Sequence, residues 1–311
     1  RFRNVTGVQT CALPIFYLAA LAGRDIFYDQ RYVHNLAMRR VLEGILRHGD
    51  EVDGGVLAEI RRYAKLFWIN TGPYNNLTAR KFVLTVTRDE LVAAAHAAVR
   101  GGAILTDSGE SPEQLIDRLS PMFLDPDVDP VVTNKSPGPG RDILAASANN
   151  LYVGVTMPEV EQFDEQYGLN SRLVKRDGRL IEEVYKIGGR YDGEIAAIVS
   201  HLEDAIPFAS PPMAEALRAL IRFYQTGRDE DRIAYDIAWV RDQHSPVDTI
   251  NGFIEVYMDA RGVKGAWEGL VYYVNAEKTR KIQTIADNAQ WFEDHMPWDP
   301  RYRKPQVLGV D

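Results

Sequence analysis

One stretch of this chain departs from the helical spacing that dominates the rest. Residues 252–258, Gly-Phe-Ile-Glu-Val-Tyr-Met, alternate with a period of two, which predicts a β-strand. Phe253, Glu255 and Tyr257 are expected on one face of it. A Gly-containing loop then turns the chain back into a second strand over residues 267–273. The stretch therefore predicts a β-hairpin in an otherwise helix-rich protein.

The predicted hairpin carries two carboxylates that repel each other. If the turn is centred between Arg261 and Gly262, Glu255 lies opposite Glu268. Like charges in that position are destabilising, so we expect the pair to bind a cation such as an ammonium group, with the Tyr257 hydroxyl donating to a developing oxyanion. Two alternatives are a solvated outer face of the sheet and an acid/base pair for glycoside hydrolysis.

Most of the remaining chain has the apolar spacing of amphipathic helices. Helices are predicted within residues 26–48, 56–67, 87–100, 111–119, 195–202, 213–224, 233–240 and 276–295. A second hairpin is expected over 171–187, turning at Asp177-Gly178. The Pro- and Gly-rich residues 125–141 predict an irregular connection and separate two parts, 16–135 and 136–311. The predicted fold is α+β, with helices packed around a small antiparallel sheet or barrel.

Composition narrows the possible partners. The 311 residues carry a net charge of −8, which argues against a nucleic-acid-binding surface. No apolar run approaches the ~20 residues of a membrane span. The single cysteine, Cys11, excludes an internal disulfide and is compatible with a reducing compartment. We therefore expect neither a nucleic-acid nor a membrane partner.

The first residues have an unusual composition. Residues 1–15 could pass for the end of a signal peptide, but Val-Thr-Gly-Val-Gln-Thr-Cys-Ala-Leu-Pro-Ile over residues 5–15 looks like a translated sequencing-adapter remnant. We interpret residues 1–15 as a non-native tail. The native N-terminus is then missing, and a cytoplasmic location is favoured with a periplasmic one as the alternative.

The chain has few other candidates for catalysis. Its histidines are scattered, without an H-E-x-x-H helix, so a metal site built from this chain alone is not expected. No phosphate-binding loop is present, and the Gly pairs are interpreted as turns. Trp239 is interpreted as a core residue, and its nearness in sequence to Glu255 makes a substrate-binding position in a cleft wall the alternative.

Several motifs resemble dipeptidyl peptidase III of the bacterial type. They are Asn-Ser-Arg-Leu-Val-Lys (170–175) before the Asp-Gly hairpin, Tyr-Asp-Ile-Ala-Trp-Val (235–240), Gly-Phe-Ile-Glu-Val-Tyr (252–257) and the region 291–303 with Met-Pro-Trp. The resemblance covers roughly residues 16–311. Its most specific element is the Gly-Phe-Ile-Glu-x-Tyr strand followed by a Glu eleven residues after the Tyr.

The resemblance implies a two-lobed zinc exopeptidase that releases dipeptides from the N-terminus of short peptides. Glu255 and Glu268 would bind the substrate's ammonium group, and Tyr257 would stabilise the tetrahedral intermediate. The loop containing Asn70 and Tyr74 would line the cleft.

The family's zinc motif, H-E-x-x-G-H, is expected beyond this sequence, so the chain is interpreted as one lobe, with no zinc of its own and no activity alone. A non-catalytic peptide- or amine-binding module is the alternative function.

Overall fold

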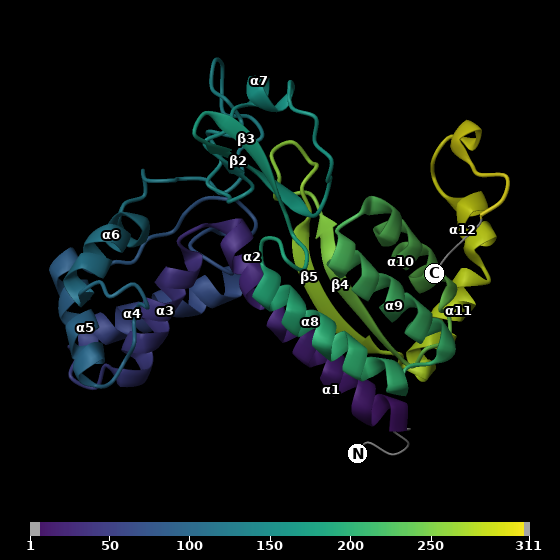
Figure 1. The fold of residues 1–311 in the computed structure, drawn as a ribbon. Coiled ribbons are helices and arrows are strands. Elements are labelled where there is room, and N and C mark those ends of the chain that lie inside the picture. The colour runs from purple at the N-terminus through teal and green to yellow at the C-terminus, as the bar shows by residue number, and fades with distance from the viewer. Residues whose placement is uncertain (1–6, 308–311) are drawn as a thin grey trace.

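The computed structural model describes residues 7–307, with side chains from Ala12 onward. Helices dominate it, and two small sheets lie among them (Figure 1). The helices are α1 (Gly7–Ala22), α2 (Arg24–Arg31), α3 (Asn35–His48), α4 (Gly54–Asn70), α5 (Arg88–Arg100), α6 (Pro112–Leu124), α7 (Met157–Val160), α8 (Asp192–Ala205), α9 (Pro211–Thr226), α10 (Asp229–Arg241), α11 (Ala276–Ala286) and α12 (Ala289–His295). The strands are β1 (Tyr152–Val153), β2 (Ser171–Arg176), β3 (Arg179–Val184), β4 (Val247–Glu255) and β5 (Ala266–Tyr273). The predicted α+β class is confirmed.

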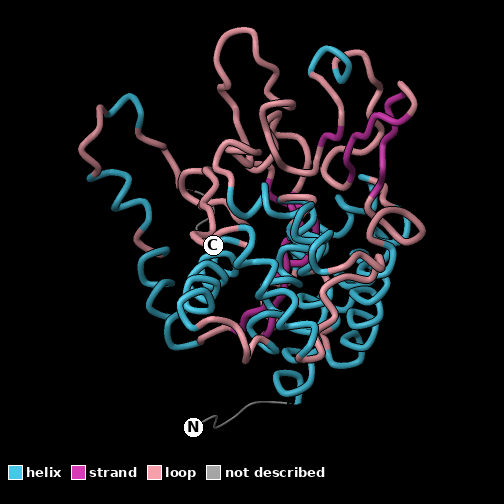
Figure 2. Tube along the Cα trace, turned by 90° about the vertical axis from the view of Figure 1, so that its left-hand side faces the viewer, coloured by secondary structure: helices cyan, strands magenta, loops and turns pink. Residues whose placement is uncertain are grey.

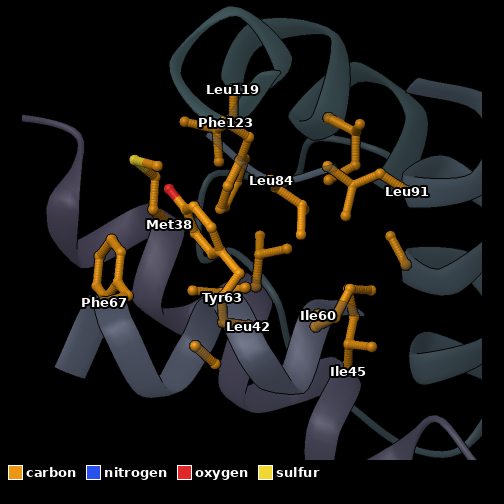
Figure 3. Packing of buried hydrophobic residues seen from close by; sticks show 14 of the residues in the cluster. Met38, Leu42, Ile45, Ile60, Tyr63, Phe67, Leu84, Leu91, Leu119 and Phe123 are labelled. Atoms are coloured by element: carbon orange, nitrogen blue, oxygen red, sulfur yellow. The ribbon is translucent and has the colours of Figure 1, made fainter. Parts of the chain in front are cut away.

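The first hydrophobic core lies between α3, α4, α5 and α6. Figure 3 shows side chains from these helices converging on Tyr63. The ring of Tyr63 lies 5.4 Å from that of Phe82 and 5.8 Å from that of Phe123, measured between centroids. Such tilted and edge-to-face pairs add to the stabilisation from burial.

The predicted starts of α5 and α6 are confirmed by their caps. Thr87 and Glu90 form a capping box at α5, and Ser111 and Gln114 form another at α6. Each box satisfies two backbone N–H groups that the first helical turn leaves without partners. These starts depend on local hydrogen bonds, which explains why the sequence alone indicates them.

The second core joins α1 to elements from the later part of the chain. Helix α1 packs against α8 and β5, and buries Phe16 and Ala19 among residues of α8, α9, β4 and β5. In Figure 1, the purple α1 runs alongside the teal α8, with the hairpin beside them. The buried side chains of this core therefore come from residues 12–26 and from residue 185 onward.

The strands form two separate, open sheets. In the first, β1 pairs parallel to β2, and β2 pairs antiparallel to β3. The predicted turn between β2 and β3 is confirmed: Asp177 and Gly178 both have positive φ, 49° and 76°, as a two-residue hairpin turn requires. The second sheet is the β4–β5 hairpin. Between Gly7 and Val307 the strands close no barrel, so of the sheet or barrel predicted only the sheet is present.

The helix predicted over residues 26–48 is broken in two. Helix α2 ends at Arg31 and α3 begins at Asn35. The side-chain amide of Asn35 is buried and donates to the carbonyls of Tyr28 and Thr71, at 2.9 and 3.1 Å. The Tyr28 carbonyl also accepts from the Tyr32 N–H at 3.2 Å, and the backbone of Tyr32 is extended, so α2 ends there.

The C-terminal helix is also divided, into α11 and α12. Its apolar residues Ile282, Ile285 and Phe292 are exposed, as are Ile233 and Ile237 of α10. Helical spacing therefore predicted these helices without predicting which faces are buried. None of the described helices is long and apolar enough to cross a lipid bilayer. Seen from the side, loops gather at one end of the molecule, beside strand segments (Figure 2).

Candidate functional site

The β4–β5 hairpin has a different register from the one expected. Glu268 lies opposite Gly252, and Glu255 lies opposite Ala266. The prediction that Glu255 faces Glu268 directly is therefore wrong. The loop joining the strands runs from residue 256 to 265 and is longer than a tight turn centred between Arg261 and Gly262.

A bulge at Ile254 restores the proximity of the two carboxylates. Phe253 pairs with Trp267, but the next paired residue of β4 is Glu255, opposite Ala266. The extra residue turns Glu255 to the face of the sheet that carries Ala266 and Glu268. Glu255 is then a diagonal neighbour of Glu268, a spacing of roughly 7–8 Å between backbones. Phe253 is buried on the opposite face, so its predicted common face with Glu255 is wrong.

Buried polar groups fix the loop that follows Glu255. The carboxylate of Asp259, completely buried, accepts hydrogen bonds from the Tyr152 hydroxyl and from the backbone N–H groups of Val263 and Lys264. The ammonium group of Lys264, also completely buried, forms a salt bridge of 2.7 Å with Glu165. Tyr152 and Glu165 lie far from this loop in the sequence, and their contacts together with the local ones replace the tight turn.

Tyr257 projects outward from this loop. The carbonyl of the next residue, Met258, accepts hydrogen bonds from Thr133 Oγ1 and Asn149 Nδ2, at 2.6 and 3.1 Å. Met258 is buried, whereas Tyr257 is 63% exposed. The backbone around Tyr257 is therefore anchored while its hydroxyl stays accessible.

The site has an excess of negative charge. Neither Glu255 nor Glu268 forms a salt bridge or a side-chain hydrogen bond within the described chain. Partial burial raises the pKa of Glu268, and the nearby charge of Glu255 raises it further. Burial also raises the pKa of Tyr257, with smaller contributions from Glu268 and Glu255. Tyr257 therefore keeps its proton at neutral pH and can donate a hydrogen bond.

A cavity of about 700 Å³ opens beside the hairpin. Glu268, Tyr257, Thr71 and Arg24, which is paired with Asp25, supply polar groups to its wall, and most of the remaining surface is aromatic or aliphatic. The aromatic residues are Tyr17, Phe27, Tyr28, Trp68 and Trp267. An apolar pocket with a few converging polar groups is the usual form of a small-molecule or peptide site.

Arg31 is a residue that the sequence analysis missed. It lies at the end of α2, is 93% removed from solvent, and lines a second cavity of about 270 Å³ that also has Tyr257 on its wall. The only signal in the sequence is its position four residues after Phe27, on the same side of the helix. That spacing is weak, because most arginines on helices are exposed.

The other predicted site residues lie elsewhere. Asn70 caps the end of α4, donating to the Leu66 carbonyl and accepting from the Asn76 N–H. Tyr74 is buried, and its hydroxyl donates to the Asp129 carbonyl. Trp239 lines a separate cavity of about 310 Å³ and donates to Asp248. Glu255, Glu268 and Tyr257 are thus brought together, whereas Asn70, Tyr74 and Trp239 do not join them.

The described residues offer no site for the zinc that the resemblance implies. Between Gly7 and Val307, no three His, Cys, Asp or Glu side chains gather closely enough to hold a metal ion. The groups available at the hairpin are two carboxylates without described partners, which are acceptors, and the Tyr257 hydroxyl, which is a donor.

Comparison with known proteins shows that the chain belongs to the peptidase class. The family model for peptidase family M49 matches residues 141–311. The sequence is 34% identical over 136 residues to dipeptidyl peptidase 3 of Dictyostelium discoideum, covering 43% of this chain and 19% of that protein. It is 29% identical over 124 residues to dipeptidyl peptidase 3 of Rattus norvegicus, covering 40% and 17%. The chain belongs to peptidase family M49, which confirms the family that the motifs resemble.

Solved structures support the same fold. Dipeptidyl peptidase III from Caldithrix abyssi superimposes with a TM-score of 0.65 at 18% identity, covering 97% of this chain and 46% of that one. The enzyme from Corallococcus sp. strain EGB gives a TM-score of 0.61 with the same coverage. The chain thus spans less than half the length of these structures.

Proposed function

We propose that this chain is the substrate-binding lobe of a zinc-dependent dipeptidyl-peptidase, formed by residues 16–135 and 136–311 together. In this proposal the lobe binds the N-terminus of a short peptide and supplies one donor to the reacting carbonyl. The observation that carries it is the pair of unpaired carboxylates, Glu255 and Glu268, on one face of the hairpin. Membership in family M49 favours this role over glycoside hydrolysis.

The two carboxylates suit an N-terminal ammonium group. Their mutual repulsion falls when a cation lies between them, and each can accept a charge-assisted hydrogen bond. The first side chains of the peptide would then enter the aromatic cavity beside Glu268.

Tyr257 would donate from its protonated hydroxyl to the carbonyl oxygen as negative charge develops there. Asn70 and Tyr74 would act indirectly, because they position the loop at residues 71–77. The family's zinc would activate the attacking water, but it has no ligand set among residues 7–307, and no residue of this chain is assigned to hold it. We infer that the lobe alone binds peptides without cleaving them.

Calorimetric titration of the purified chain tests the ammonium-binding role. A peptide with a free N-terminus is expected to bind about tenfold more tightly than its acetylated form. The substitution Glu268→Gln should abolish that difference. Glu215→Gln, at an exposed position of α9, is the matched control and should preserve it. Equal affinity of the wild-type chain for both peptides would refute the proposal.

A further inference from the structure

The cavity lined by Arg31 has the opposite charge to the hairpin. Its polar groups are the cations of Arg31 and Lys135, the amides of Asn75 and Asn76, and the hydroxyls of Thr133 and Tyr257. No carboxylate of the described chain lines it. The cavity at Arg31 is therefore an electropositive pocket.

Arg31 lacks a counter-ion in this pocket. Its Nη2 donates to the Tyr74 carbonyl at 2.8 Å, while its enclosed Nε has no acceptor within the described chain. It forms no salt bridge with a described carboxylate. A buried cation is costly unless an anion pairs with it, so the pocket is suited to receiving one.

The loop opposite Arg31 is arranged to donate as well. The side-chain oxygen of Asn75 accepts from the backbone N–H groups of Leu77 and Thr78, at 2.9 and 3.1 Å. This orientation leaves the Asn75 amide nitrogen as a donor. Two cations and amide donors around one small cavity match the bonding capacity of a carboxylate.

Building on the proposed function, we infer that this pocket binds a carboxylate of the same peptide whose ammonium group Glu255 and Glu268 hold. Tyr257 lines both the aromatic cavity at Glu268 and the pocket at Arg31, so sites of opposite charge meet at one side chain. The ligand class is a short zwitterionic peptide. Its carboxylate comes either from the C-terminus of a dipeptide or from an acidic side chain.

Calorimetry with four ligands separates these possibilities. Ala-Ala carries both charges, its C-terminal amide lacks the carboxylate, and N-acetyl-Ala-Ala lacks the ammonium group. Ala-Asp amide has the ammonium group, and its one carboxylate is that of the Asp side chain. Ala-Ala is expected to bind about tenfold more tightly than its amide, as one charge-assisted interaction would give. If Ala-Asp amide binds as tightly as Ala-Ala, the pocket accepts a side-chain carboxylate. If it binds only as weakly as Ala-Ala amide, the pocket accepts the C-terminal carboxylate.

Variants of the pocket complete the test. Arg31→Gln should remove the preference for the acid over the amide, and Lys135→Gln should reduce it roughly two- to threefold, as an exposed charge would. Lys135 is exposed, so its substitution remains informative if Arg31→Gln fails to fold. Lys65→Gln, exposed on α4, is the matched control and should leave the preference unchanged.

Each outcome separates this inference from the proposed function. If Ala-Ala binds more tightly than its C-terminal amide, but N-acetylation does not weaken binding, the pocket at Arg31 is supported and the ammonium site is refuted. If N-acetylation weakens binding, but Ala-Ala and its C-terminal amide bind equally, only the pocket at Arg31 is refuted. The inference also fails if Ala-Ala shows no saturable binding, or if neither Arg31→Gln nor Lys135→Gln changes the preference.

Discussion

The side-chain oxygen of Gln30 accepts a 2.7 Å hydrogen bond from the backbone N–H of Trp267, and its amide nitrogen donates to the Gly265 carbonyl at 3.0 Å. Gln30 is completely buried. It fixes α2 to the start of β5, the strand that carries Glu268, and Arg31 is the next residue of the helix. One helix end therefore positions both charged sides of the candidate site.

Replacing Gln30 by Leu should destabilise the protein strongly. The change leaves a buried N–H and a buried carbonyl without partners, at about 1–3 kcal/mol each. We expect the free energy of unfolding in urea to fall by at least about 2 kcal/mol. Gln225→Leu, at an exposed position of α9, is the control. A loss as small as that of the control would show that water replaces both bonds.

Replacing Gly23 by Ala should also destabilise the protein. A Cβ atom at this position would lie 1.9 Å from Cζ2 of Trp267, so the ring or the helix junction must move. Overpacking of this kind costs about 1–3 kcal/mol. Gly193→Ala, where a Cβ meets nothing within 4 Å, should be neutral or stabilising because it lies in α8. Thermal unfolding of the two variants gives the comparison, and equal melting temperatures would contradict it.

Stability should depend on pH through Glu268. Its folded-state pKa is raised, so the folded protein holds this proton more tightly than the unfolded chain does. The resulting stabilisation is complete below the unfolded pKa and is lost as pH rises through the folded value.

Gln does not ionise, so the Glu268→Gln variant avoids this loss. Relative to the wild type, the variant should be more stable at neutral pH than it is in acid. Urea unfolding at several pH values measures the difference between variant and wild type, with Glu215→Gln as the charge control. A difference that does not change with pH would contradict the assignment.

Replacing Asp259 by Asn should loosen the loop that carries Tyr257. The new NH₂ group would face N–H donors that now bond to the carboxylate. We expect a loss of roughly 1–3 kcal/mol in the free energy of unfolding. Hydrogen exchange of the Val263 and Lys264 amides should accelerate more than that of amides in α4. Asp204→Asn, exposed at the end of α8, should have neither effect.

Local signals in the sequence were sufficient for part of this fold. The caps at Thr87 and Ser111 and the Asp177-Gly178 turn involve residues within three positions of each other, so their hydrogen bonds can be anticipated. The bulge at Ile254 could not be, because the loop that accompanies it is held by Tyr152 and Glu165, about a hundred residues away.

The candidate site was predictable to a similar extent. Glu255, Glu268 and Tyr257 were identified from two strands and a family motif, although their register was wrong. Arg31 was missed because its burial depends on a carbonyl of Tyr74, beyond the end of another helix. Asn70 ends α4 and Tyr74 lies in the loop after it, the segment that was expected to line the cleft, but it is Asn75 and Asn76 that reach a cavity.

The packing of α1 against α8 and β5 imposes an order on folding during synthesis. Helices α3 to α6 bury their core with contacts inside residues 28–132, so this part can fold while the rest is still being translated. Helix α1 is made before these helices, but its partners follow much later: α8 ends about 180 residues after α1, and β5 about 250. Contacts so distant in sequence form slowly. A nascent chain must therefore keep the apolar side of α1 from aggregating until α8 and then β5 emerge.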